Sequence, residues 1–276
     1  MPLLEFLTEP FQYAFMVKAL IVSIVVGITC AILSCFLILK NWALLGDAVS
    51  HAVLPGVVIA YMLGIPFGIG AFVFALLSVV MIGFIKNNSK IKEDAVMGIV
   101  FTTLFALGLI MISKIVSPGH LMHILFGQVL GISDSAAWLT AITMGVVAVI
   151  ILLFRKVFMV FCFDPTHART IGMPMTFVHY AFLVLLAIVI TGSIQTVGII
   201  LVIAMLIIPG STAFLLTKRF PTMLQLAIIT SLISSIVGVY ASYYFDVSTG
   251  GTIVFVQGLI FLSVFTFQLL RSRQLA

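Results

Sequence analysis

Long apolar runs separated by short polar connections restrict the fold of this sequence more than any other feature. Of the 276 residues, 63% are hydrophobic and only 8% are charged, and the mean hydropathy is +1.37. A helix needs about 20 apolar residues to cross a bilayer, and the first run, Phe15–Leu39, exceeds that length. The composition excludes a water-soluble globule and predicts an all-α integral membrane protein.

We expect a single transmembrane domain over residues 1–276, with eight to nine membrane-spanning helices. A tenth run, Leu121–Leu130, is too short to span and carries His123 and Gln128, so we interpret it as a half-inserted or interfacial segment. The nine candidate spans are Phe15–Leu39, Asp47–Leu63, Gly68–Ile85, Val96–Ile112, Ala136–Leu153, Phe177–Thr191, Val197–Leu216, Met223–Tyr243 and Thr252–Leu270.

Lys and Arg residues occur at the ends of these runs, which indicates orientation in the membrane rather than a nucleic-acid partner. Cytoplasmic loops of membrane proteins carry an excess of Lys and Arg. We therefore expect the cation-rich side to be cytoplasmic and the N-terminus to be external, while a miscounted span would give eight spans with both termini inside. If nine spans alternate, the same side receives Lys40, Lys86, Lys90, Lys92, Arg155, Lys156, Arg169, Lys218, Arg219, Arg271 and Arg273.

The longest polar connection, residues 155–175, falls on the predicted cytoplasmic side. Asp164 is suited to cap a short helix that begins at Pro165, and Gly172 is suited to end that helix in the left-handed conformation. A capped helix at the membrane surface predicts a docking element for another protein. The alternative is an ordered loop without a partner.

Asp47 and His51 are the most informative polar pair in the apolar part of the chain. Their spacing of four places a carboxylate and an imidazole on one helix face, which is typical of a bidentate metal site. Pro55 has no N–H to bond the carbonyl of His51, so it predicts a kink and a third ligand oxygen. The alternatives are a helix N-cap for Asp47 and a buried, hydrogen-bonded core residue for His51.

Other candidates carry weaker signals. His120 and His123 lie three apart in a connection on the external side, where polar residues need no special reason. Pro209 and Gly210 lie deep in the seventh run, where they indicate either irregular backbone beside a pathway or a purely structural kink. The sequence contains no Gly-Lys pair and hence no Walker-type phosphate loop, so any energy from nucleotide must come from another polypeptide.

The run from Gly46 to Gly56 resembles the signature of permease subunits of bacterial manganese, iron and zinc ABC importers. His123–Gly127 resembles the manganese and iron branch of that family, and Gly172–Pro174 and Ala204–Pro209 are also similar to it. The resemblance implies a fold similar to the cobalamin and siderophore importer permeases, in the bacterial cytoplasmic (inner) membrane. It also implies a second permease subunit, identical or paralogous, two cytoplasmic ATP-binding subunits and an extracytoplasmic metal-binding protein.

The resemblance implies that the transported metal binds at Asp47 and His51. It also implies that this chain has no tightly bound cofactor and no enzymatic activity of its own. Carboxylate and imidazole ligands without cysteine suit manganese and ferrous iron, and we place zinc second. Pro165, Thr166 and His167 differ from the Glu-Leu-Leu pattern of many relatives. The ATPase-coupling residues that the resemblance implies are Asp164, Pro165, Thr166, His167, Ala168, Arg169 and Gly172.

Two other classes of function remain as hypotheses. An autonomous metal channel or proton-coupled carrier would use Asp47 as a proton relay and would not need a docking helix at residues 155–175. An intramembrane enzyme would need metal-activated water at Asp47 and His51, and the sequence offers no further base or ligand there.

Overall fold

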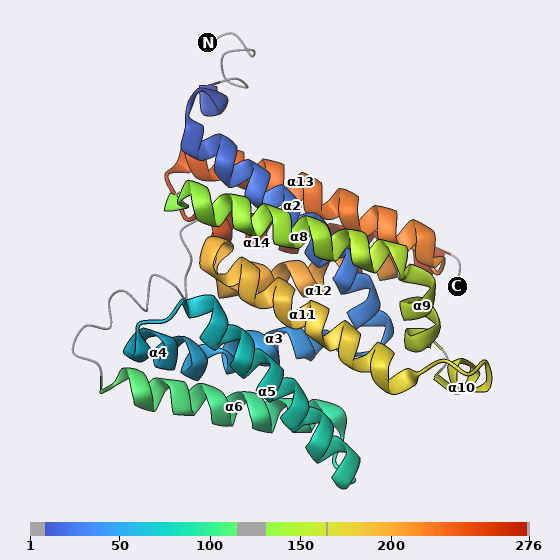
Figure 1. Cartoon of the computed structure of the whole chain (residues 1–276). Helices are drawn as coiled ribbons and strands as arrows, with labels where there is room; N and C mark the ends of the chain where they lie inside the picture. Colours follow the sequence, from blue (N-terminus) through green and yellow to red (C-terminus); the bar gives the residue numbers. More distant parts are fainter. Residues whose placement is uncertain (1–8, 115–130, 164, 275–276) are drawn as a thin grey trace.

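The computed structural model describes residues 9–114, 131–163 and 165–274, and helices make up nearly all of this part of the chain (Figure 1). The short helix η1 precedes the helices long enough to cross a membrane, and α9 and α10 lie between α8 and α11. The bounds are η1 Glu9–Gln12, α2 Ala14–Leu39, α3 Ala43–Ala52, α4 Leu54–Leu63, α5 Phe67–Asn88, α6 Glu93–Ile112, α8 Asp134–Leu153, α9 Arg155–Phe163, α10 Pro165–Thr170, α11 Met175–Val197, α12 Ile199–Leu216, α13 Phe220–Phe245 and α14 Thr249–Gln274.

The described residues contain nine candidate membrane spans, with α3 and α4 together forming the second. The prediction of an all-α protein with eight to nine spans is therefore confirmed. The second span begins at Ala43 and not at Asp47, and the sixth continues to Val197 and not to Thr191. In the polar end of α11 the hydroxyls of Ser193 and Thr196 donate to carbonyls of the preceding turn, so these polar groups are satisfied within the helix.

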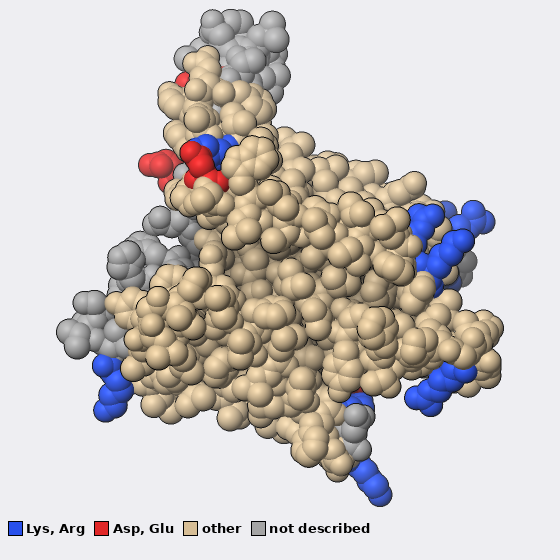
Figure 2. All heavy atoms as spheres, in the orientation of Figure 1, with Lys and Arg blue, Asp and Glu red and all other residues tan. Residues whose placement is uncertain are grey.

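Charged side chains lie at the ends of the helices. Figure 2 shows Lys and Arg toward the edges of the face that is drawn, with an uncharged surface between them. At one end Lys86 of α5 pairs with Glu93 of α6, Nζ to Oε2 2.7 Å. The cytoplasmic assignment of the cation-rich side stays a prediction.

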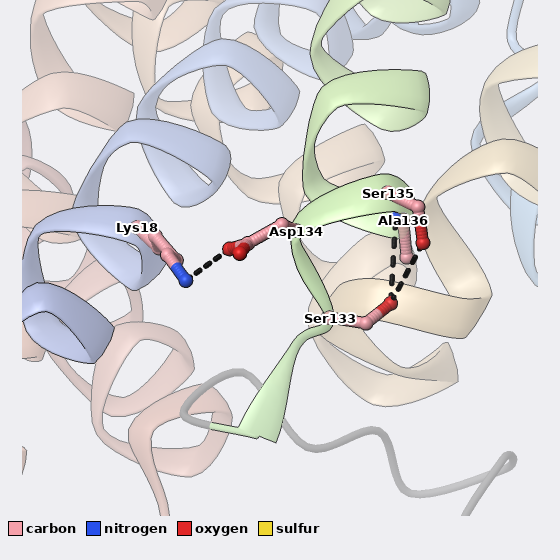
Figure 3. A network of polar contacts seen from close by, with 5 residues as sticks. All are labelled: Lys18, Ser133, Asp134, Ser135 and Ala136. Carbon is pink, nitrogen blue, oxygen red and sulfur yellow. Dashed lines mark hydrogen bonds and ion pairs between the residues drawn. The ribbon is translucent and has the colours of Figure 1, made fainter.

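The opposite end carries a polar network at the start of α8 (Figure 3). Lys18 of α2 forms an ion pair with Asp134 in the first turn of α8. Ser133 is the N-cap of α8, and its Oγ accepts the backbone N–H of Ala136 at 3.4 Å. The pair and the cap fix the beginning of α8 against α2.

Helix α2 forms the centre of one half of the molecule, where it packs against α8, α12 and α13 (Figure 1). Small residues permit the close approach. The N–H of Gly210 in α12 donates to Ser34 Oγ at 3.0 Å, and a Cβ at Gly210 would overlap the backbone of Ser34. Close contact through Gly and Ser is the usual way that membrane helices associate, because burying apolar surface gives no advantage over lipid.

Helices α3 to α6 form a second group, which α11 and α12 join to the first. Gly56 of α4 and Gly70 of α5 touch so closely that a Cβ on either would overlap the other's carbonyl oxygen. Gly108 of α6 meets the side chain of Leu54 in the same way. These contacts hold α4 between α5 and α6 and thereby set the position of α3, which carries Asp47 and His51.

Candidate metal site and coupling segment

Asp47 and His51 lie on one face of α3, as their spacing predicts. His51 Nδ1 is 3.1 Å from Asp47 Oδ1 and 3.1 Å from the backbone oxygen of Asp47. The Asp47 side chain is 34% exposed and the His51 side chain is 27% exposed. This face of the membrane-spanning segment is therefore accessible from outside the chain. The N-cap alternative for Asp47 is wrong, because the N-cap of α3 is Trp42, five residues earlier.

Two phenylalanines of α6 pack against the His51 imidazole. The ring centroids of Phe101 and Phe105 lie 5.1 Å and 5.4 Å from that of His51, both in edge-to-face geometry. The aromatic contacts and the Asp47 contact together orient the ring so that Nδ1 faces the carboxylate. Sequence reasoning missed both residues, although their spacing of four puts them on one face of α6.

The break that Pro55 predicts is present, and it falls at Val53 between α3 and α4. Pro55 lies in the first turn of α4, where its missing N–H costs nothing. The carbonyl of His51 accepts the N–H of Val53, so the structure gives it a partner within the chain and does not support its use as a third ligand.

By themselves, Asp47 and His51 would offer a metal ion two ligand side chains. Across residues 9–114, 131–163 and 165–274, no group of three or more His, Cys, Asp or Glu side chains converges. One carboxylate and one imidazole leave a divalent cation short of the four or more ligands that zinc, manganese or iron takes. Any further ligands of a metal at this pair would have to come from outside the described part of this chain.

Pro209 and Gly210 lie in the packing between helices. Helix α12 runs without interruption through Pro209, and both residues are buried. The Ser34 hydroxyl that receives Gly210 N–H donates in turn to the carbonyl of Ile207 at 3.3 Å. The observed contacts support a purely structural role for Pro209 and Gly210. Helix α12 contacts α3 through Leu206, which packs on Gly46.

The predicted short helix in the polar connection is present as α10. Gly172 follows it with φ of 73°, the left-handed conformation expected at its end, and Met173 N–H bonds to the carbonyl of Ala168 at 3.0 Å. Thr166 and Arg169 are exposed. Ala168 is fully buried within the chain, so its expected direct contact with an ATPase needs correction: it packs the helix in place and does not face out.

Several predicted residues lie outside the described residues. They are Asp164, the expected cap of α10, His120, and the segment Leu121–Leu130, which contains His123. Their expected roles stay predictions.

Comparison with known proteins agrees with this geometry. The family model described as "ABC 3 transport family" matches residues 12–268 of this chain. The chain is 48% identical over 269 residues to a "Probable iron transport system membrane protein" of Haemophilus influenzae, covering 98% of this chain and 99% of the relative. It is 51% identical to the "Manganese transport system membrane protein MntB" of Synechocystis, covering 95% and 85%.

A solved structure agrees as well. PsaBC from Streptococcus pneumoniae in complex with Fab superposes with a TM-score of 0.85 at 40% sequence identity, covering 95% of this chain and 94% of that one. The fold and the family match thus define a multi-pass membrane transport protein of the permease class. The chain belongs to the ABC 3 transport family.

Proposed function

We propose that this chain moves a divalent metal ion across the bacterial cytoplasmic membrane as the permease subunit of an ABC importer, with manganese or ferrous iron as the preferred cargo and zinc second. The observation that carries the proposal is the Asp47–His51 pair on an open face of a buried membrane-spanning segment. Relatives named for iron and manganese transport support the choice of metal.

A second permease subunit, identical or paralogous, completes the site. The pair supplies two ligands, and the same pair from a facing subunit would supply two more, which gives a four-ligand site on the axis between the subunits. A site divided between two subunits also explains why the two side chains remain partly exposed in the single chain. When the subunits move apart, the site loses half of its ligands and releases the ion, as transport requires.

The ligand chemistry fits a hard or borderline cation. Carboxylate oxygen and imidazole nitrogen suit manganese, ferrous iron and zinc, while the three cysteines of the chain are buried elsewhere and unavailable as ligands. His51 Nδ1 lies 3.1 Å from Asp47 Oδ1. A metal binds imidazole in its neutral form and carboxylate in its ionised form, so metal binding at this site competes with protons.

The energy for transport comes from separate ATP-binding subunits. The single domain of residues 1–276 has no phosphate-binding loop, and α10 with its capping Gly172 is an exposed element on the cation-rich side. We assign ATPase docking to the exposed residues of this segment, together with Asp164, and metal delivery to an extracytoplasmic binding protein. Membership of an ABC transport family favours this arrangement over an autonomous channel, carrier or intramembrane enzyme.

The test is metal uptake into vesicles that contain this chain, its ATP-binding subunits and its binding protein. Manganese, iron and zinc are compared with and without ATP, and a hydrolysis-defective ATPase subunit serves as the matched control. We expect ATP-dependent accumulation with manganese or iron ahead of zinc. Equal uptake without ATP, or uptake by the permease chain alone, would contradict the proposal.

A further inference from the structure

A cavity lies at the cation-rich end of the molecule, between the end of α2, the start of α3 and the segments α5, α6, α9, α10 and α11. Its volume is about 530 Å³, within the range of about 300–1,000 Å³ typical of small-molecule sites. The ionisable residues that line it are Lys40, Lys86, Glu93, Arg169 and His179. Asp47 and His51 do not line this cavity, so it is separate from the proposed metal site.

The cavity carries unbalanced positive charge. Lys86 is neutralised by Glu93 at 2.7 Å. In the part of the chain that the structure describes, Lys40 and Arg169 form no ion pair with a carboxylate. Lys40 instead donates to the carbonyl of Phe161 at 3.3 Å, and its Nζ lies 4.4 Å from the centroid of the Phe161 ring.

The Lys40 ammonium also lies 5.6 Å from the centroid of the Trp42 ring. A partly buried ammonium held by a carbonyl and two ring faces is incompletely compensated, because none of these partners carries a full negative charge. An anion in the cavity would supply that charge to Lys40 and to Arg169 together. Arg169 offers the planar fork of donors that matches phosphate oxygens, and Thr176 and Tyr180, which carry hydroxyl groups, also line the cavity. The donor set therefore suits a phosphate group better than a carboxylate of a single side chain.

The other wall is apolar. Val79 and Ile82 of α5 and Leu183 of α11 line it, and all three belong to membrane spans. The cavity thus joins cationic side chains to apolar side chains of two membrane spans. Basic pockets between membrane helices on the cytoplasmic side are known to hold anionic headgroups.

We propose that this cavity binds a phosphate-bearing anion, with Lys40 and Arg169 as its charged ligands, at a site separate from the Asp47–His51 pair. The two sources of such a group are an anionic phospholipid of the adjacent leaflet and a soluble phosphate. A phosphate group here bridges α2, which precedes the metal-site helix α3, to α10. Occupancy therefore stabilises the contact between the polar connection and the helix bundle.

The test measures the melting temperature of the full-length chain in detergent during titration with three probes: phosphatidylglycerol, phosphatidylcholine and inorganic phosphate. We expect phosphatidylglycerol to raise the melting temperature more than phosphatidylcholine does. A rise with inorganic phosphate as well assigns the site to the phosphate group itself, and a rise with phosphatidylglycerol alone assigns it to the lipid.

Matched variants locate the effect. Arg169→Gln and Arg219→Gln each remove one exposed cation at the same end, but only Arg169 lines the cavity. We expect Arg169→Gln to weaken the apparent affinity for the anion about tenfold, the worth of a charged hydrogen bond, and Arg219→Gln to leave it unchanged. Lys40→Gln should weaken it similarly, and if that variant does not fold, the exposed Arg169 still provides the test.

Two results would overturn the proposal. One is an equal rise in melting temperature with phosphatidylglycerol and phosphatidylcholine and none with phosphate. The other is an equal loss of affinity in Arg169→Gln and Arg219→Gln, since that would mean diffuse surface charge and not a cavity.

Discussion

Asp47 is an acidic residue within a membrane-spanning segment, and such residues are costly to insert, by about 2.5–3.5 kcal/mol at the bilayer centre. Its local compensation is the contact with His51 Nδ1 at 3.1 Å, and 34% of its side chain stays exposed. If Asp47 served only in packing, the exposed part of its carboxylate would make no stabilising contact that offsets the cost of placing it in the membrane. This exposure is what the proposed metal-ligand role of Asp47 requires, and Phe101 and Phe105 pack against the imidazole beside it.

Asp47→Ala is expected to abolish metal uptake while the chain still inserts and assembles, because it removes the anionic ligand of the pair. Uptake into reconstituted vesicles and the yield of folded protein are measured together. Asp134→Ala is the matched control, since it removes a carboxylate that is 73% exposed and pairs with Lys18 away from the site. Normal uptake by folded Asp47→Ala would exclude Asp47 as a ligand.

His51→Ala is expected to reduce uptake as strongly as Asp47→Ala, while His51→Asp should retain part of it, because a second oxygen ligand still suits manganese. The loss in His51→Asp should be greater for zinc than for manganese, since zinc gains more from imidazole nitrogen. Transport rates for both metals are the measurement. If all His51 variants transport normally, the histidine is a packing residue only.

At the scale of elements, the contact between α4 and α5 has almost no tolerance for added volume. A Cβ on Gly56 would overlap the carbonyl of Gly70 and crowd the Phe74 ring, whereas nothing lies within 4 Å of one placed on Gly98 of α6. We expect Gly56→Ala to destabilise the protein by about 1–3 kcal/mol and to lower its melting temperature. Gly98→Ala should be neutral or stabilising by up to about 1 kcal/mol. Equal melting temperatures for the two variants would contradict the close packing.

The coupling proposal belongs to the same scale and rests on the exposed face of α10. Because Ala168 is buried in the chain, a large residue there would disturb the protein's own packing and would not isolate a partner contact. Arg169→Glu reverses a charge on the exposed face instead. We expect it to weaken copurification of the ATP-binding subunits while metal still raises the melting temperature of the permease.

Arg219→Glu, which makes the same change between α12 and α13, is the control for Arg169→Glu. If Arg169→Glu retains the ATP-binding subunits and Arg219→Glu loses them, the docking surface lies in the connection between α12 and α13 and not on α10.

For the whole molecule, the orientation in the membrane is open to a direct test because all three native cysteines are buried and free. Burial also raises the pKa of the Cys162 thiol in α9 to about 12, which keeps it unreactive near neutral pH. The native chain therefore provides a silent background for a membrane-impermeant maleimide.

We expect Lys114→Cys to react with this reagent in intact cells and Lys218→Cys to react only after permeabilisation. Lys114 follows the end of α6 and Lys218 follows the end of α12, and both side chains are exposed. Nine alternating spans with an external N-terminus place these two ends on opposite sides. Labelling of both variants in intact cells would refute that topology.

The number of spans and the Asp47–His51 pair were predictable from the sequence, because both follow from local rules. A run of about 20 apolar residues crosses a bilayer, and residues four apart share a helix face. Pro55 and Gly172 were predictable for the same reason, since each acts on the backbone within one turn.

Only the tertiary structure decided which residues surround these features. Phe101 and Phe105 reach His51 from another helix, Gly210 meets Ser34 across a separation of 176 residues, and Ala168 turns inward. The cavity with Lys40 and Arg169 is assembled from segments far apart in the chain. The sequence cannot indicate these neighbours because lipid and protein interior are equally apolar, so a membrane helix that is apolar on every side carries no pattern that marks which face packs inward.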